Sequence, residues 1–297
     1  ERFVISVKTD NAGTSLDNEF TLPWIGTYDV DWGDGNKQTG VTDSQTHTYA
    51  TSGDYDIKVK ATTGRIYFNN SGDKSKVIDI KNWGTCAWTT MYRAFQGCDN
   101  LDISAVDIPN LTNINSTHSM LDRCTSLIGN NSMGLWDVSN VTVMGHMFYR
   151  CGLFNIDISA WDMSNVTDMQ RMFYMNGVVG SFNQPIGNWD VGNLVTAKSA
   201  FEKLSSFNYS LGDWDISNVT DLRGLFEWIF GGLGMDVSNY NDTLIKWAAQ
   251  TPQNNVQAHF GEFKYSYEAA AARQTLIDTY GWTITDGGQA VAPEFAL

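Results

Sequence analysis

An internal repeat constrains this chain more than any other feature. The segment WDMSNVTDMQRMF at 161–173 has close copies at 136–148 (WDVSNVTVMGHMF) and 214–226 (WDISNVTDLRGLF), and a looser copy at 189–201 (WDVGNLVTAKSAF). A unit this short cannot bury its own Trp, Met and Phe side chains, whereas stacked copies can, because each covers the apolar face of its neighbour. The repeat therefore predicts an elongated stack with one continuous core.

The spacing of apolar residues within one unit predicts its local structure. Ile158, Trp161 and Met163 follow the L-x-x-L-x-L spacing of a leucine-rich repeat, which favours a short strand. After the SNVT turn, apolar residues recur every three or four positions, which favours a short helical or 3₁₀ segment. An earlier, degenerate copy starts at Leu101. The expected tryptophan column consists of Val106, Trp136, Trp161, Trp189 and Trp214.

The segments that flank the stack predict different structures at its two ends. FVISVKT, YDVDWGDG and YDIKVKA alternate apolar and polar residues between Gly and Asp turns, so residues 1–62 are predicted to form a small β-sandwich. Residues 63–240 would hold the solenoid. Helical spacing at 241–250 and 265–280 predicts that 241–297 form a C-terminal cap. The predicted fold is mainly β with short helices: a leucine-rich-repeat solenoid preceded by a β-sandwich and closed by a helical cap.

Composition excludes some classes of partner. The 297 residues include 33 acidic and 19 basic ones, a net charge of -14, which repels phosphate backbones and argues against nucleic acid. No long apolar run occurs, so no membrane insertion is expected. The N-terminus lacks the basic and apolar regions of a signal peptide, so the chain is expected to be an excised or processed piece. Abundant Asn, Asp, Ser, Thr and Gly with few lysines is typical of secreted bacterial proteins.

Three of the four cysteines recur with the repeat. Cys98, Cys124 and Cys151 follow one another at 26 and 27 residues, which is the repeat period. Later units have in this slot Asn176, Leu204 and Ile229. Because Leu and Ile fit there, the slot is expected to face inward. Neighbouring thiols could still approach closely enough for a disulfide, so both redox states stay open.

Two sets of motifs resemble known families. YDVDWGDGN followed by HTYATSGDYDIKV resembles the PKD-type extracellular β-sandwich, although the segment is short for that domain. The repeats WD[VMI]SNVT…MF, with GTCAWTTMYRAFQGC before them and GWTITDGG after them, resemble the BspA-type repeats of bacterial surface proteins. These resemblances imply a secreted or cell-surface protein of the adhesin kind, part of a larger surface-attached protein. They imply no catalytic residues and no required cofactor.

The stack would align one aspartate from every unit. The column comprises Asp107, Asp137, Asp162, Asp190, Asp215 and Asp236. Outward carboxylates on strands about 4.8 Å apart repel one another, so something must offset the repulsion. Either calcium or a basic ligand bridges them, or each carboxylate accepts a backbone N–H in an Asx turn, which the recurring D-x-[SG]-N context favours. The candidate ligand-binding aspartates are Asp137, Asp162, Asp190 and Asp215.

Two other polar patterns have a structural and a functional interpretation. Asp29, Asp31 and Asp34 in DVDWGDG are candidate metal ligands for calcium, but the glycines between them favour an ordinary hairpin turn. The sequons of successive units recur because the turn recurs, and their asparagines are expected to bond to one another along the stack.

Aromatic residues offer a second candidate surface. Tyr149 and Tyr174 follow the M-F pair in neighbouring units, and Tyr209 and Trp228 lie in later loops. An exposed aromatic column is a platform for sugars or peptides, whereas a buried one only thickens the core, and the sequence favours neither. The four histidines show no spacing typical of a catalytic triad, and no carboxylate pair is singled out, so the chain is not expected to be an enzyme.

These patterns together predict an extracellular recognition or adhesion module. It would bind a cell-surface glycan or protein ligand on the solenoid face, because extended repeat surfaces suit large ligands. The alternatives are a structural spacer or display domain and, less favoured, a polysaccharide-acting enzyme.

Overall fold

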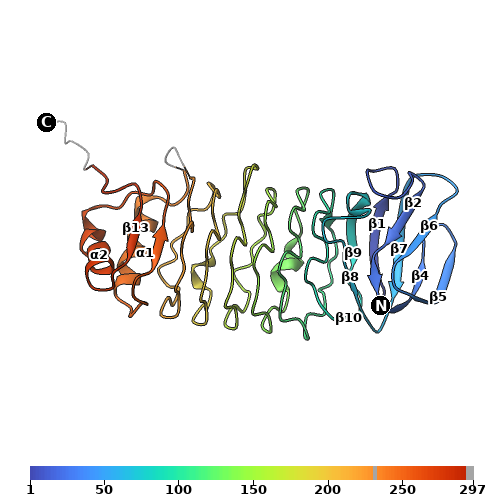
Figure 1. The fold of residues 1–297 in the computed structure, drawn as a ribbon, viewed down its shortest axis with the longest axis horizontal. Coiled ribbons are helices and arrows are strands. Elements are labelled where there is room, and N and C mark those ends of the chain that lie inside the picture. The colour runs from blue at the N-terminus through green and yellow to red at the C-terminus, as the bar shows by residue number, and fades with distance from the viewer. Residues whose placement is uncertain (230–232, 292–297) are drawn as a thin grey trace.

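The structure is a computed structural model that describes residues 1–229 and 233–291. The molecule is elongated, with β-sheets at one end, two helices at the other, and successive turns of chain side by side between them (Figure 1). These successive turns, residues 83–229, are named the stack.

The strands are β1 (Phe3–Lys8), β2 (Glu19–Leu22), β3 (Trp24–Ile25), β4 (Thr27–Asp31), β5 (Lys37–Thr42), β6 (Gln45–Thr48), β7 (Asp54–Lys60), β8 (Thr63–Ile66), β9 (Val77–Asn82), β10 (Ala87–Trp88), β11 (Asp102–Ile103), β12 (Gln257–His259) and β13 (Thr283–Thr285). The helices are α1 (Val237–Ala248), α2 (Tyr267–Asp278) and the 3₁₀ helices η1 (Lys74–Lys76), η2 (Asn131–Leu135) and η3 (Ile186–Asn188).

The N-terminal sheets form from the segments whose alternation predicts strands. One six-stranded sheet has the order β11-β9-β1-β7-β4-β5, and two shorter sheets have the orders β2-β6 and β10-β8-β3. Phe3 of β1 contacts the ring of Trp24 on β3 and that of Trp88 on β10, at centroid distances of 6.1 and 5.0 Å. The core therefore lies between the large sheet and the shorter ones. Because β9 and β11 belong to the large sheet, this sheet continues past residue 62 into the stack.

Backbone hydrogen bonds in the stack alternate between two kinds. Along 144–150, the N–H groups of even-numbered residues donate to carbonyls of the next turn, whereas those of Met147 and Tyr149 donate three residues back. His146 and Arg150 have φ angles of 59° and 61°, in the left-handed region. Most other turns have left-handed residues at the same two positions. In most turns, two left-handed corners four residues apart bend the chain while its carbonyls stay aimed at the neighbouring turn.

This backbone contradicts two expectations about the repeat. No strand forms at Ile158, Trp161 and Met163, and the segment after SNVT is neither α- nor 3₁₀-helical. The left-handed corners interrupt helical bonding, and half of the N–H groups that a helix would use donate to the next turn. Parallel bridges between turns lie just after SNVT, through Val143, Asp168, Thr196 and Asp221.

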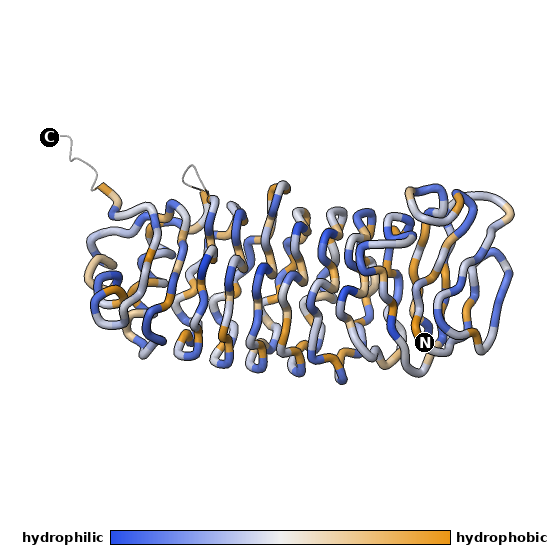
Figure 2. Tube along the Cα trace, in the orientation of Figure 1, coloured by the Kyte–Doolittle hydropathy of each residue, from blue (hydrophilic) through white to orange (hydrophobic). Residues whose placement is uncertain are grey.

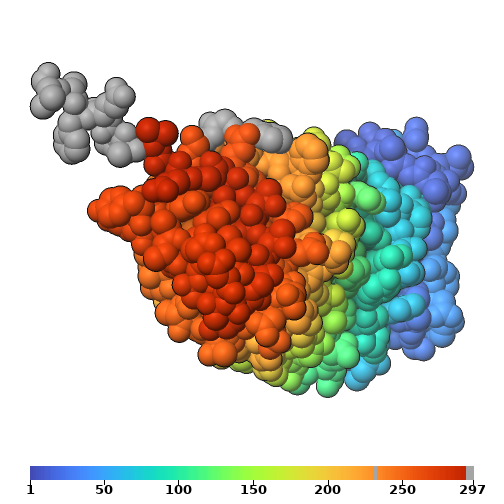
Figure 3. Space-filling model, turned by 60° about the vertical axis from the view of Figure 1, so that its left-hand side comes forward, coloured from blue at the N-terminus to red at the C-terminus, as the bar shows by residue number. Residues whose placement is uncertain are grey.

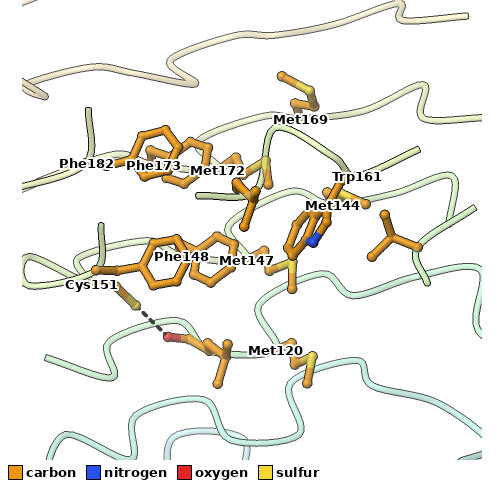
Figure 4. Packing of buried hydrophobic residues seen from close by; sticks show 14 of the residues in the cluster. Met120, Met144, Met147, Phe148, Cys151, Trp161, Met169, Met172, Phe173 and Phe182 are labelled. Atoms are coloured by element: carbon orange, nitrogen blue, oxygen red, sulfur yellow. Dashed lines mark hydrogen bonds between the residues drawn. The ribbon is translucent and has the colours of Figure 1, made fainter. Parts of the chain in front are cut away.

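Apolar side chains from successive turns form columns inside the stack. Hydrophobic positions alternate with polar ones along each turn (Figure 2). Phe148 and Phe173 lie parallel at a centroid distance of 5.5 Å, with the buried Met147 and Met172 beside them (Figure 4). Phe201 continues the column at 5.7 Å from Phe173. One continuous core therefore results from the repeat, as the sequence predicts.

The last three repeat tryptophans are each hydrogen-bonded to the turn before them. The indole Nε1 bonds run from Trp161 to Met133 O (2.9 Å), from Trp189 to Ile158 O (3.1 Å) and from Trp214 to Ile186 O (2.9 Å). Trp247 of α1 makes the same bond to Leu211 O at 2.8 Å. Helix α1 thus takes the place of one more turn in this tryptophan ladder.

The expected place of Val106 in the tryptophan column is wrong. Its side chain is 86% exposed, whereas the preceding Ala105 is fully buried. The small Ala105 leaves room in this degenerate turn, and the rings of Trp83 and Trp136 meet at 5.5 Å. Trp136 Nε1 is consequently left without a hydrogen-bond partner among the described residues.

The cysteine column faces inward, as predicted. Cys98, Cys124 and Cys151 are fully buried free thiols, and burial raises the pKa of each. The thiol of Cys151 donates to a backbone carbonyl of the preceding turn at 3.0 Å (Figure 4). Asn176, however, is exposed, and Met175 is buried in its place because this turn lacks the second left-handed corner.

The C-terminal residues, coloured orange and red in Figure 3, cover the end of the stack, and they include helices α1 and α2 (Figure 1). Asp236 accepts the N–H of Asn239 and so caps the start of α1. Ala258 of β12 bridges to Leu222, and β13 pairs in parallel with β12, which extends the row of bridges beneath the helices. The two predicted helices are confirmed. No helix within 1–229 or 233–291 is both long and apolar enough to cross a membrane.

Candidate functional site

The repeated aspartates form turns on the surface of the stack. The carboxylates of Asp137, Asp162, Asp190 and Asp215 accept the backbone N–H two residues later, at 3.2, 3.0, 3.1 and 2.9 Å. Hydrogen bonds from the side chain and backbone of Ser164 lower the pKa of Asp162. The Asx turns predicted from D-x-[SG]-N are therefore present, and all four side chains are exposed.

Two members of the expected column have other partners. Asp107 accepts the N–H groups of Trp83 and Gly84, at 2.9 and 2.8 Å, because its degenerate unit lacks the SNVT turn. Asp236 caps α1. Both residues therefore stabilise the ends of neighbouring segments and do not continue the row of Asx turns.

The asparagines of the SNVT turns bond along the stack, but to the backbone. The side-chain amides of Asn140, Asn165, Asn193 and Asn218 donate to carbonyls of the preceding turn at 3.2, 2.8, 2.7 and 2.7 Å. Gln253 continues the row by donating to Ser217 O at 2.6 Å. The expected bonding of asparagines to one another is wrong, because a backbone carbonyl of the preceding turn lies within reach of each amide.

The three candidate metal ligands of the N-terminal part have separate partners. Asp29 accepts the N–H of Gly40 at 2.9 Å, Asp31 pairs with Lys37 at 3.0 Å, and Asp34 lies 2.8 Å from His47 Nε2. The hydrogen bond from Lys37 is the largest cause of the lowered pKa of Asp31. No group of three or more His, Cys, Asp or Glu that could hold a metal ion occurs in the described part of the chain.

Tyr149 and Tyr174 belong to a longer row of rings on one face of the stack. This aromatic ribbon consists of Tyr92, His118, His146, Tyr149 and Tyr174. Successive ring centroids lie 5.6, 5.2, 5.3 and 5.2 Å apart. Tyr92 is 36% exposed and Tyr149 only 9%. The rings therefore pack on one another, with Tyr149 buried and the other four partly exposed or exposed, which lies between the two alternatives that the sequence left open.

A glycine brings the two histidines of the ribbon together. A Cβ atom on Gly145 would lie 2.8 Å from Nδ1 of His118, so only glycine lets the His118 ring cross this position. The left-handed corner at His146 turns its ring toward His118. The sequence places these histidines one position out of register, and their contact follows from a neighbouring glycine, not from the repeat spacing.

Cationic side chains lie over the tyrosines of the ribbon. The guanidinium carbons of Arg93, Arg123 and Arg171 lie 4.9, 5.7 and 5.8 Å from the ring centroids of Tyr92, Tyr149 and Tyr174, respectively. Lys203 Nζ lies 5.7 Å from the ring of Tyr174. Burial, then His118 and the nearby arginines, lowers the pKa of His146 to about 4. Sequence analysis missed these arginines because all three occupy left-handed corners, which the apolar spacing of the repeat does not reveal.

Comparison with known proteins identifies one family. Residues 89–177 and 175–269 each match the family described as Mycoplasma protein of unknown function, DUF285. No curated protein and no solved structure matches the chain. The two matched segments cover most of the stack and helix α1, and together they span more than half of the 297 residues. The chain therefore belongs to the DUF285 family.

Proposed function

We propose that this chain is an extracellular recognition or adhesion module, without catalytic activity, that binds a cell-surface glycan or protein along the aromatic ribbon. One observation carries the proposal: ring contacts of 5.2 to 5.6 Å run without a break over successive turns on one face. Aromatic rings offer flat apolar area, and tyrosine adds a hydroxyl group for hydrogen bonding. Because each turn presents the same outward positions, the surface suits a long ligand.

The proposed setting is a secreted or cell-surface protein of which this chain is a part. Residues 63–240 would be a leucine-rich-repeat solenoid of the BspA type, residues 1–62 a PKD-like β-sandwich, and residues 241–297 the cap. Support comes from the WGDG and WD[VMI]SNVT motifs and from the ladder of tryptophan bonds that joins the turns. The exposed Asx-turn aspartates form a second candidate contact surface, for a basic group or calcium.

Binding of the labelled chain to a glycan array and a panel of surface proteins tests the proposal, once with calcium and once with chelator. Tyr92→Ala should weaken binding at least about fivefold, because stacking on an aromatic ring contributes about 1 kcal/mol or more. Tyr209→Ala is the matched control, since Tyr209 is 38% exposed and Tyr92 36%, and Tyr209 lies outside the ribbon.

The outcomes separate the candidate functions. Ligands whose binding resists Tyr92→Ala would exclude the ribbon as the site. A blank array and panel would favour the spacer, and release of shortened sugars from a polysaccharide panel would make the chain an enzyme. Hits that appear only with calcium, and persist in Tyr92→Ala, would transfer the site to the aspartates.

A further inference from the structure

We infer that the aromatic ribbon binds a linear polysaccharide that carries carboxylate groups, with sugar rings on the aromatic side chains and carboxylates on the adjoining arginines. The inference rests on the proposed function of the ribbon and adds the chemical class of its ligand.

Three arginines at or next to the ribbon have no carboxylate partner. Arg93 and Arg171 lie over rings of the ribbon, and Arg150 follows Tyr149 in the chain and donates its backbone N–H to Tyr174 O at 3.0 Å. Arg93, Arg150 and Arg171 form no ion pair with any described residue, although the chain has 33 acidic residues. Elsewhere, Arg223 and Arg273 lie 2.7 and 2.8 Å from carboxylate oxygens. Although tyrosine rings lie against Arg93 and Arg171, no carboxylate of the described residues neutralises these three guanidiniums, so their charge is open to an anion from outside.

The same three arginines also have unused hydrogen-bond donors. The Nε atoms of Arg93, Arg150 and Arg171 are buried and have no partner within the described residues. A buried donor left without a partner costs about 1–3 kcal/mol. A guanidinium presents its donors as a planar fork that fits both oxygens of a carboxylate. A carboxylate from outside would pair with the charge through the terminal guanidinium nitrogens, and it would reach the covered Nε donors only when the side chains around them move apart.

The carboxylates near the ribbon do not supply this partner. Glu202 is 8% exposed and lies against Tyr174, whose pKa is raised by burial and then by Glu202, and it forms no ion pair with a described residue. Asp122 is 3% exposed, burial raises its pKa, and Gln96 donates to it at 2.6 Å. Its closest cation is Arg123, at 3.8 Å. Asp168 accepts the N–H of Gln170 at 2.7 Å and forms no ion pair with a described residue. The positive charge of Arg150 and Arg171 thus remains available.

The alternation of rings and cations favours a polysaccharide over other anions. A sugar ring has apolar faces that stack on aromatic side chains, and a uronic acid adds one carboxylate to each such ring. An acidic peptide would pair with the arginines, but it has no flat apolar ring to lie on the exposed part of the ribbon. Duplex nucleic acid carries one charge per about 1.7 Å, and a chain of net charge -14 repels so dense an anion most strongly.

The inference is tested with the full chain and three polymers: polygalacturonate, its fully methyl-esterified form, and poly-L-glutamate. We expect polygalacturonate to bind, to bind more weakly as salt rises, and to bind at least about tenfold more tightly than its methyl ester. The double variant Arg150→Gln/Arg171→Gln should lose about tenfold in affinity.

Lys60→Gln is the control, with melting of every variant followed by circular dichroism. Lys60 is exposed on β7 in the N-terminal sheet and forms no ion pair with a described residue, so its loss should leave binding unchanged. Equal binding of the polymer and its methyl ester overturns the carboxylate inference, and the ribbon proposal survives if Tyr92→Ala weakens both. Tighter binding of poly-L-glutamate overturns it in favour of an acidic peptide. Binding that none of the ribbon variants affects refutes both proposals.

Discussion

Lys76 shows how a single buried charge fixes a loop of the N-terminal part. Its ammonium is fully buried and donates to Ser15 O, Ser15 Oγ, Leu16 O and Glu19 O, at 3.2, 2.9, 2.7 and 2.9 Å. Burial raises the pKa of Asp73 beside it, but hydrogen bonds from Ser15 and Thr21 outweigh burial and lower it overall. The 15–21 loop therefore closes around a cation that the chain itself supplies.

Lys76→Met should lower the free energy of unfolding by about 3 kcal/mol or more, because it leaves the Asp73 carboxylate buried without its cation. Lys74→Met is the control. Lys74 Nζ makes one hydrogen bond, to Gly97 O at 3.0 Å, and its loss should cost less than about 1 kcal/mol. Urea denaturation measures the free energy of unfolding of both variants. Equal decreases would show that the four hydrogen bonds of Lys76 stabilise the fold no more than the single bond of Lys74.

His146 makes stability depend on pH in a direction opposite to that of a paired histidine. Its folded-state pKa is about 4, below the ordinary 6.5, mainly because of burial. Between these values the unfolded chain binds more protons than the folded one, so stability falls as the pH falls from 6.5 toward 4.

His146→Asn should reduce this loss. Asparagine tolerates the left-handed corner and does not titrate, so the stability difference between about pH 7 and about pH 4.5 should shrink by about 1 kcal/mol, allowing for solvent screening. Urea denaturation at both pH values measures it. An unchanged difference would mean that other groups carry the acid sensitivity.

At the scale of the repeating element, the tryptophan bonds can be separated from tryptophan packing. Trp189 and Trp136 are both 2% exposed, but only Trp189 Nε1 has an acceptor, Ile158 O at 3.1 Å. Trp189→Phe and Trp136→Phe remove similar ring volume. Trp189→Phe should cost about 1–2 kcal/mol more, because it also leaves a buried carbonyl without its donor. If both variants lose the same free energy of unfolding in thermal or urea denaturation, the indole hydrogen bonds contribute nothing beyond the packing of the rings.

The sequence predicts those parts of the element that depend on neighbours within a few residues or on the repeat period. Asp162 and its equivalents form Asx turns because donor and acceptor are two residues apart. The buried positions of Cys124 and Cys151 could be predicted from the repeat period, because Leu and Ile occupy the same slot in later units. Val106 and Asn176 were misplaced because the first lies in a degenerate turn and the second in one with a different corner.

The candidate site was only half predictable for a similar reason. Tyr149 and Tyr174 repeat with the motif and could be found by it. The ring of His118 reaches His146 through space left by Gly145, and Arg171 stands at a left-handed corner that few non-glycine residues adopt. Such contacts depend on the backbone shape of the turn. Apolar spacing did not reveal this shape, because it predicted a helical segment there.

At the scale of the whole molecule, backbone hydrogen bonds run without interruption from the N-terminal sheets into the stack. Strand β9 pairs with β1 on one side and with β11 on the other. The ring of Phe3 lies within 6.5 Å of both Trp83 and Phe95 of the stack. Toward the other end, Trp247 of α1 continues the bonds of the repeat tryptophans. The same core therefore runs from the first strand to the cap.

A continuous core predicts that the chain unfolds as one unit. Ile57→Ala in β7 and Leu225→Ala in the last turn each empty a fully buried site and should each cost about 2–4 kcal/mol. Although the two sites lie in opposite parts of the molecule, each substitution should lower the midpoint of a single calorimetric transition. In hydrogen exchange, each should weaken the protection of strand β1 and of the stack together, because nearest-neighbour contacts couple every turn to the next. If Ile57→Ala instead exposes only residues before about 83, and Leu225→Ala only residues after them, the N-terminal sheets are an independent folding unit and the shared strand β9 does not couple the two.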